Sequence, residues 1–314
     1  MIQEKITVGL GTEYPLKGIL TLPDKLDKPV PAVVFVHGSG SSNMDEKVMK
    51  LTPFKDLAEG LAERGVASIR YDKRSFAHGM KMLRDKNLFI TVKEETIEDA
   101  VLATEMLRKD PRIDSDNIYI IGHSMGAMLA PRIDAEGGNY KGIIMMAGTL
   151  RRLEEVMIEQ NNEALQSMNK LLQLIGKKQM EKINNSFKNL YSISDEEAKA
   201  KKMGGGTTLY YFKEMGEHAA DDYLKNTDKP MLIMQGEKDF QVKADIDFTG
   251  YQSLLKDRDN VTFKLYEGLN HAFVSYITED ITKAKKEYGV ERHIGNEVIS
   301  DIAGWILSNS VETI

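Results

Sequence analysis

Short runs of apolar residues alternate with amphipathic stretches through most of this chain of 314 residues. The runs "AVVFV" at 32–36, "IYII" at 118–121 and "MLIM" at 231–234 are apolar throughout, as is typical of strands buried on both faces of a parallel sheet. Stretches such as 54–65 and 92–110 repeat apolar residues three or four apart, which predicts helices. Since parallel strands need crossover connections, the alternation predicts an α/β fold with a mostly parallel, eight-stranded sheet flanked by helices.

The alternation stops in one long segment. Residues 150–225 contain no strand pattern and are charged, rich in Lys, Glu, Asn and Leu, and helical in period. We therefore expect residues 1–149 and 226–314 to form one sheet domain, with 150–225 inserted as a helical cap or lid. Several apolar residues of the insertion suggest a partly apolar substrate pocket, although packing of the cap on the core would also explain them. They are Leu171, Leu172, Leu174, Tyr210, Tyr211 and Phe212.

Composition excludes several classes of protein. A net charge of -6 disfavours broad contact with nucleic acid or with a membrane surface, because such surfaces need an excess of Lys and Arg. The chain has no Cys, and therefore no disulfide and no thiolate ligand or nucleophile. No signal peptide, membrane span or metal-binding spacing is visible, so we expect a cytoplasmic protein without a metal or other cofactor.

A serine stands between two glycines where a predicted strand meets a predicted helix. In "GHSMG", Gly122 and Gly126 flank Ser124 at two residues on either side. Small residues there let the chain turn sharply, which lifts the serine hydroxyl above the sheet at the N-terminus of the next helix. This G-x-S-x-G pattern favours a nucleophilic serine over a merely tight turn. His123 should point away from the serine and serve in packing or hydrogen bonding.

A nucleophilic serine needs a base, which in this kind of fold lies on a loop after a later strand. His271 in "GLNHAF" follows the predicted strand 261–266 and is our candidate. His293, at the start of the last helix, is the alternative. We expect His78 in a polar loop and His218 in the insertion, solvated or lining the lid.

The acid that orients the base should follow the preceding strand. Asp239 in "GEKDFQV" has the expected place, and Glu237 is its rival. Asp245 and Asp247 fall on the next predicted helix, where a solvated face is the simpler interpretation. In "YDKR", we expect Asp72 to pair with Arg74 and to order a loop beside the site.

The tetrahedral intermediate of acyl transfer needs backbone donors for its oxyanion. The N–H of Met125, directly after the serine, is one candidate. The second is the N–H of Ser39 in "HGSGSSN", which His37 opens and in which Gly38 and Gly40 let the backbone approach a substrate. A dinucleotide loop is disfavoured, because the third glycine of G-x-G-x-x-G is missing.

Five segments together resemble the α/β-hydrolase superfamily, and most of all its dienelactone-hydrolase and prolyl-oligopeptidase-like serine esterases, which include cinnamoyl and feruloyl esterases. The segments are "FVHGSG", "IRYDKR", "DPRIDSDNIYIIGHSMG", "QGEKDFQV" and "GLNHAF". The resemblance covers nearly all of the chain outside 150–225, and it places Ser124, Asp239 and His271 at the triad positions. Nothing here resembles the β-propeller of prolyl oligopeptidases, which disfavours a peptidase.

These observations predict a serine esterase that cleaves small to medium acyl or aromatic esters through an acyl-enzyme. An acyltransferase, a thioesterase or an amidase would use the same triad, and sequence does not separate them. A catalytically dead hydrolase fold that binds a small ligand is a further alternative, disfavoured by the intact set of residues. The expected partner is a small-molecule ester, and a homodimer is left open.

Overall fold

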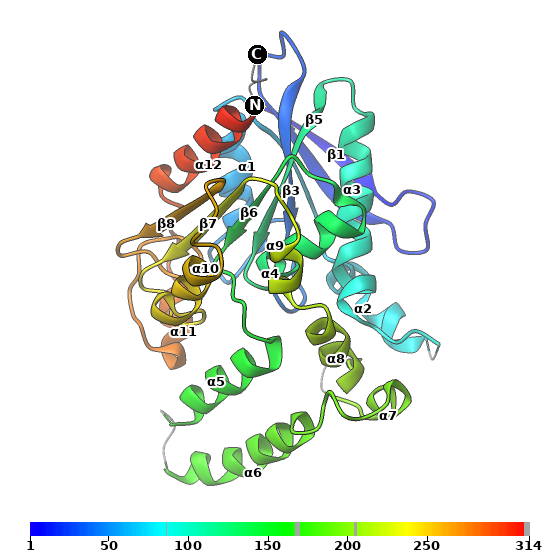
Figure 1. The fold of residues 1–314 in the computed structure, drawn as a ribbon, viewed down its shortest axis with the longest axis vertical. Helices are drawn as coiled ribbons and strands as arrows, with labels where there is room; N and C mark the ends of the chain where they lie inside the picture. Colours follow the sequence, from blue (N-terminus) through cyan, green and yellow to red (C-terminus); the bar gives the residue numbers. More distant parts are fainter. Residues whose placement is uncertain (86, 167–169, 204–205, 311–314) are drawn as a thin grey trace.

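The computed structural model describes residues 1–85, 87–166, 170–203 and 206–310, without the side chains of 170–175 (Figure 1). Within this part, eight strands form one sheet in the order β1-β2-β4-β3-β5-β6-β7-β8. Strand β2 pairs antiparallel with both neighbours, and the strands from β4 to β8 run parallel. The strands are β1 (Ile2–Val8), β2 (Leu16–Leu22), β3 (Val30–Val36), β4 (Ala67–Tyr71), β5 (Ile113–His123), β6 (Gly142–Met146), β7 (Met231–Gly236) and β8 (Val261–Tyr266). The predicted fold class is confirmed.

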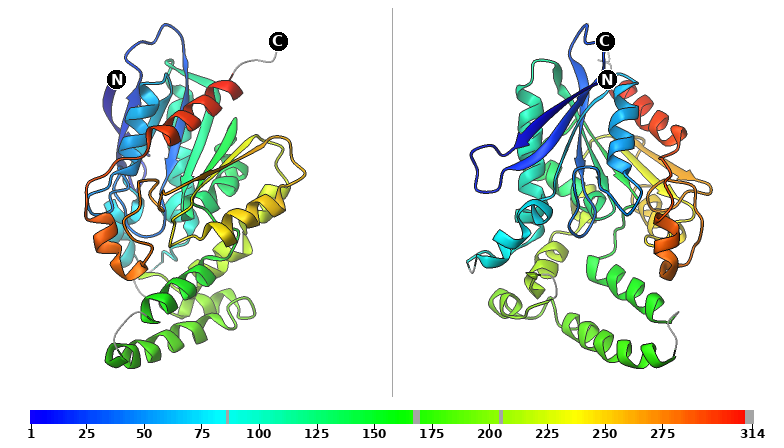
Figure 2. Two further views of the ribbon diagram at one scale, coloured as in Figure 1. Left: turned by 90° about the vertical axis from the view of Figure 1, so that its left-hand side faces the viewer. Right: turned by 180° about the vertical axis from the view of Figure 1, so that it is seen from behind.

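Helices cover both faces of the sheet (Figures 1 and 2). On one face, Val33 and Phe35 of β3 pack in a core with α1 (Pro53–Ala62) and α12 (Asn296–Asn309). On the other, Val34 and Val36 pack with α3 (Glu98–Lys109) and α4 (Met125–Ile133). The remaining elements of the core are α2 (Arg74–Arg84), η1 (Lys93–Ile97), η2 (Asp134–Gly138), η4 (Ala244–Phe248), α10 (Thr249–Leu254), η5 (Ile281–Lys283) and α11 (Ala284–Tyr288). Because both faces of β3 are buried in this way, its sequence is apolar at every position.

Three local expectations are wrong. His78 lies in helix α2 and not in a polar loop, because 74–84 place Phe76, Met80 and Leu83 on one helical face. Strand β5 begins at Ile113, so it includes polar residues before the apolar run. Helix α12 begins at Asn296, which leaves His293 in the preceding loop.

The described elements between β6 and β7 are helices, joined by loops. These insertion helices are α5 (Leu153–Gln166), α6 (Lys170–Phe187), α7 (Asp195–Ala200), α8 (Leu209–Glu217) and α9 (Ala220–Lys225). The chain runs from the C-terminal end of β6 to α5, and helices α5 to α8 lie beyond that end of the sheet (Figure 1). Arg132 of α4 pairs with Glu214 of α8, which ties the insertion helices to the core. Among the described helices, none is long and apolar enough to cross a bilayer.

Candidate active site

Ser124 occupies a strained turn between β5 and α4. Its φ of 54° and ψ of -118° lie in a region of backbone conformation that residues other than glycine rarely adopt. A Cβ on Gly122 would lie 2.2 Å from the carbonyl oxygen of Gly126, and a Cβ on Gly126 would lie 2.2 Å from that of Val36. Both glycines are therefore required by close backbone contacts. The half-buried side chain of Ser124 is held where β5 ends, at the N-terminus of α4.

His271 and Asp239 meet on the loops that follow β8 and β7. Nδ1 of His271 lies 2.7 Å from Oδ2 of Asp239, and the carboxylate is fully buried. The same carboxylate accepts hydrogen bonds from Nε2 of Gln235 (2.8 Å) and from the amides of Gln241 (2.8 Å) and Val242 (2.9 Å). Four donors thus fix the carboxylate. With Nδ1 donating to it, Nε2 of a neutral His271 ring is left as the acceptor.

The rival acids lie elsewhere. Glu237 is exposed and accepts a hydrogen bond from the amide of Gly268 at 3.0 Å. Asp245 is exposed, as expected. Asp247 is buried, contrary to the expectation of a solvated face, because the hydroxyl of Thr149 and the guanidinium of Arg151 both donate to its carboxylate.

Two further histidines, His293 and His218, have exposed side chains. His293, whose side chain is 68% exposed, pairs with Asp56 at 3.0 Å. His218 is exposed, and its Nδ1 lies 2.9 Å from the hydroxyl of Tyr223. Neither contacts the acid that His271 contacts.

Two backbone amides near the serine are free to donate. Within the described ranges, neither the N–H of Met125 nor that of Ser39 donates a hydrogen bond. The N–H of Gly38 is occupied, because it donates to Oε1 of Glu46 at 2.7 Å. Gly40 has a φ of 82°, which favours glycine, and a Cβ on Gly38 would lie 3.2 Å from Cβ of Ser124. The loop after β3 therefore approaches the serine closely and leaves Ser39 exposed.

Glu46, which the sequence analysis did not single out, connects this loop to His123. Its Oε2 lies 2.9 Å from Nδ1 of His123 in a contact that is poorly aligned for a hydrogen bond, so we describe it as an ion pair. Nε2 of His123 lies 2.9 Å from the carbonyl oxygen of His271, and the two rings are 4.7 Å apart. Both ring nitrogens of His123 thus face acceptors, as in a charged imidazolium.

The pKa values agree with this charge state. Burial alone would lower the pKa of His123, but the Glu46 carboxylate and the His271 carbonyl outweigh it and raise that pKa. Burial would raise the pKa of Glu46, yet His123 and the amide of Gly38 bring it below its ordinary value. His37 lacks such a carboxylate contact, and burial lowers its pKa to about 4. It is therefore neutral, with Nε2 3.1 Å from the carbonyl oxygen of Asn43.

The "YDKR" segment contributes a buried lysine. Nζ of Lys73 donates to the carbonyl oxygens of Gly38 (2.9 Å) and Gly40 (3.1 Å), and lies 3.5 Å from Oε2 of Glu95. The expected pairing of Asp72 with Arg74 is wrong. Arg74 instead binds Asp99 and Glu98 on α3, while Asp72 accepts the amide of Met44. Strand β4 ends at Tyr71 and α2 begins at Arg74, so the chain turns from strand to helix between Asp72 and Arg74 and directs them to different partners.

A cavity of about 1080 Å³ adjoins the two free amides, and we call it the α2 cavity. Its lining includes Ser39 and Met125, and also Glu95 and the insertion residues Tyr211 and Phe212. One wall is the apolar face of α2. Of the other apolar insertion residues, Tyr210 lines a different depression, and the side chains of Leu171, Leu172 and Leu174 lie outside the described part.

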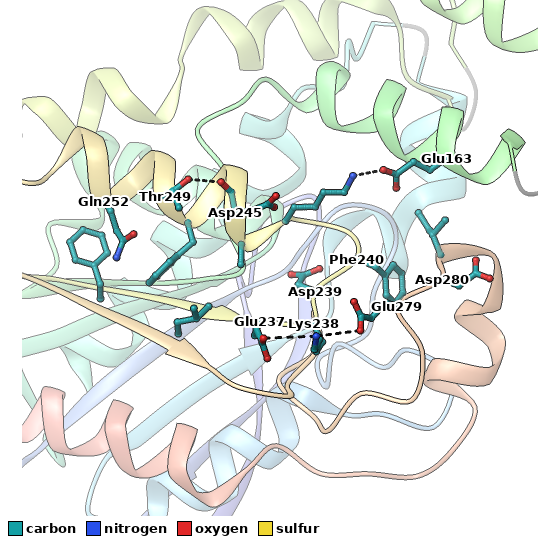
Figure 3. Close-up of a pocket in the computed structure, with 16 residues that line it drawn as sticks. Glu163, Glu237, Lys238, Asp239, Phe240, Asp245, Thr249, Gln252, Glu279 and Asp280 are labelled. Atoms are coloured by element: carbon teal, nitrogen blue, oxygen red, sulfur yellow. Dashed lines mark hydrogen bonds and ion pairs between the residues drawn. The ribbon is translucent and has the colours of Figure 1, made fainter.

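A second cavity, of about 890 Å³, is lined in part by the loop that follows β7, which carries Asp239 (Figure 3). Asp239 belongs to its lining, but Ser124 and His271 do not. Its two lysines pair with glutamates of the lining, Lys243 with Glu163 and Lys238 with Glu279. Among the described residues, no group of three or more His, Asp or Glu side chains is arranged to hold a metal ion.

Taken together, the sheet order and the strand-to-helix turn at Ser124 define an α/β-hydrolase. The chain belongs to the family described as serine aminopeptidase, S33, whose model matches residues 27–275. Esterase EstD of Thermotoga maritima is 34% identical over 292 residues, which cover 93% of this chain and 65% of EstD. The chain therefore spans just under two thirds of the length of that relative.

Solved structures share the fold. Est1E of Butyrivibrio proteoclasticus, solved with ferulic acid bound, has a TM-score of 0.59 at 15% identity, covering 96% of this chain and 99% of Est1E. The esterase Pf2001 of Pyrococcus furiosus has a TM-score of 0.58 at 16% identity, covering 98% of this chain and 91% of Pf2001. At these identities the likeness concerns the fold.

Proposed function

We propose that this protein is a serine esterase that hydrolyses carboxylic esters with apolar acyl or alcohol groups through an acyl-enzyme. The proposal is carried by the buried hydrogen bond between His271 and Asp239 and by the serine in a strained turn, whose neighbour His123 has its ring 4.7 Å from that of His271. The esterase relative at 34% identity supports ester over amide substrates. The likeness of the fold to Est1E and Pf2001 agrees with it.

In this proposal, Oγ of Ser124 attacks the ester carbonyl while Nε2 of His271 takes its proton. The amides of Met125 and Ser39 donate to the oxyanion that forms. The histidine then passes the proton to the leaving alcohol, and Asp239 stabilises the transient imidazolium. Water cleaves the acyl-enzyme by the same steps in reverse order. In this scheme the chain supplies the acid, the base and the first nucleophile, and water is the nucleophile of the second step.

In this proposal the insertion helices form a cap over the substrate site. Tyr211 and Phe212 of α8 line the α2 cavity, as do Leu153 and Met157 of α5. A substrate in the cavity would thus lie between α2 of the core and residues of the insertion. We propose that residues 150–225 limit the size of the group that the site accepts.

The test is hydrolysis of p-nitrophenyl esters from acetate to decanoate, with p-nitroacetanilide as the matched amide. Ser124→Ala should lose about 10³-fold or more in kcat while its circular dichroism is unchanged. Ser308→Ala, on the exposed face of α12, is the control and should match the native chain. A fluorophosphonate should label the native chain at Ser124, as located by peptide mass spectrometry. Equal activity of native and Ser124→Ala would overturn the proposal, and faster cleavage of the anilide than of the acetate ester would make the protein an amidase.

A further inference from the structure

One carboxylate faces the α2 cavity among mostly apolar neighbours. Glu95, at the centre of η1, is 8% exposed and lines the cavity together with Met125. Helix α2 presents Phe76, Met80 and Leu83 to the same space. Burying a carboxylate costs free energy unless it is paired, so the partners of Glu95 show how its charge is stabilised.

Only one of its oxygens is occupied by the described part of the chain. Oε2 accepts the hydroxyl of Tyr211 at 2.7 Å and lies 3.5 Å from Nζ of Lys73. Oε1 accepts no hydrogen bond from the described residues. It is also not one of the fully buried side-chain atoms that lack a partner, so it keeps some exposed surface. Since Glu95 lines the α2 cavity, that oxygen is an acceptor open to whatever enters there.

The charge of Glu95 is already compensated. Lys73 lies buried beside it, with its other donors directed to the carbonyl oxygens of Gly38 and Gly40. Burial lowers the pKa of Lys73, and Glu95 opposes this effect, so the lysine and the carboxylate act as a pair. A neutral donor can hydrogen-bond to Oε1 without upsetting this balance, whereas a cation would compete with the lysine.

We propose that Glu95 is a specificity residue, which accepts a hydrogen bond from a hydroxyl group carried on the part of the ester that enters the α2 cavity. The proposal rests on the proposed esterase function and deepens it: the preferred substrates are esters whose apolar or aromatic group bears a hydroxyl. Tyr211 holds the carboxylate from the insertion side and Lys73 from the core side. The apolar face of α2 would cover the rest of the group.

The test compares esters that differ in one substituent. On the acyl side the pair is p-nitrophenyl 3-phenylpropanoate and its 4-hydroxyphenyl analogue, and on the alcohol side 2-phenylethyl butanoate and its 4-hydroxyphenyl analogue. A 4-methoxyphenyl and a 4-(aminomethyl)phenyl member complete each set. The measured quantity is the ratio of kcat/KM between members of one set. A general loss of activity cancels in that ratio, because it affects every member.

In the native protein, the hydroxyl member of at least one set should exceed both the unsubstituted and the methoxy members by about tenfold. Glu95→Gln should reduce that ratio at least threefold, because a neutral amide is a weaker acceptor than a carboxylate. Glu98→Gln removes the same charge at the next glutamate, which binds Arg74 outside the cavity lining, and should leave the ratio unchanged.

Four results would overturn the proposal. Native ratios near one in both sets would do so even if Glu95→Gln failed to fold, and the unsubstituted esters would still report the esterase function. A ratio that survives Glu95→Gln would assign the preference to another residue. A preference for the ammonium member that Glu95→Gln abolishes would make Glu95 a cation site. Absence of hydrolysis with every ester would remove the proposed function and this inference together.

Discussion

The carboxylate of Glu46 links the loop after β3 to His123, through 2.7 Å to the amide of Gly38 and 2.9 Å to Nδ1 of the histidine. Because His123 in turn contacts the carbonyl oxygen of His271, one carboxylate holds both the proposed oxyanion loop and the proposed base. Glu46 itself has a φ of 49°, a conformation that costs energy unless its surroundings fix it. We therefore predict that Glu46 acts as a positioning residue.

Glu46→Gln should therefore lower kcat on p-nitrophenyl butanoate by about 10- to 100-fold with little change in KM, since a charged acceptor and an ion pair are lost while the substrate pocket remains. Steady-state kinetics checks this, with Glu63→Gln on the exposed end of α1 as the control. An unchanged kcat would contradict the positioning role. A fall in the urea midpoint without a fall in kcat would limit Glu46 to stability.

Gly126→Ala should unfold or severely destabilise the protein, because the new Cβ would lie 2.2 Å from the carbonyl oxygen of Val36. Backbone atoms cannot yield as a flexible side chain does, so we expect a loss of roughly 3 kcal/mol or more in the free energy of unfolding. Urea denaturation measures it. Gly304→Ala in α12, where a Cβ meets nothing within 4 Å, should instead gain about 0.5–1 kcal/mol. Equal stabilities of the two variants would show that the turn can relax.

The sequence predicted those features that depend on neighbours along the chain. Apolar runs located the strands, and the strand ends suggested Ser124, Asp239 and His271, because parallel strands bring their C-terminal loops together. The structure brings Asp239 and His271 into contact, and the catalytic roles of the three stay predictions. Helix α2 could have been predicted as well. Its residues Phe76, Met80 and Leu83 have helical spacing, but the turn-like polar residues between them obscured it.

The residues that the sequence did not reveal are paired across the fold. Glu46 meets His123, and Glu95 meets Lys73 and Tyr211, each from a different element. A buried ion pair has no local pattern, since either partner alone resembles a solvated charge. The mistaken pairing of Asp72 with Arg74 has the same origin. Proximity in sequence suggested that pairing, whereas in the folded chain Arg74 binds the carboxylate of Asp99, which is distant in sequence.

Acid should destabilise the protein through His37. Burial lowers the pKa of folded His37 to about 4, below its ordinary value of 6.5. Between these two pH values His37 is protonated in the unfolded chain but neutral in the folded chain. That contribution to stability is fully present above pH 6.5 and is lost as pH falls toward 4, by about 3 kcal/mol. Unfolding by urea at pH 7 and pH 4.5 should therefore show a larger loss for the native chain than for His37→Gln. Parallel losses in both would mean that His37 takes up its proton without unfolding.

The apolar face of α2 offers the last prediction. Phe76, Met80 and Leu83 are 52%, 64% and 48% exposed, although all three are large apolar residues that line the α2 cavity. A long acyl or alcohol chain would cover them and gain about 25 cal/mol for each Å² removed from water. Met80→Asp places a charge in that wall and should reduce kcat/KM for p-nitrophenyl decanoate about tenfold, while acetate, too short to cover the wall, changes less than about twofold.

Leu10→Asp provides the matched control for this change. Leu10 is 83% exposed in the turn between β1 and β2 and does not line the cavity, so the same new charge there should leave the whole chain-length profile intact. Equal losses on acetate and decanoate in Met80→Asp would indicate a general disturbance of the site. An unchanged profile would place the long chain in another part of the molecule. Only a loss that grows with chain length agrees with substrate bound along α2, between the core and the insertion helices.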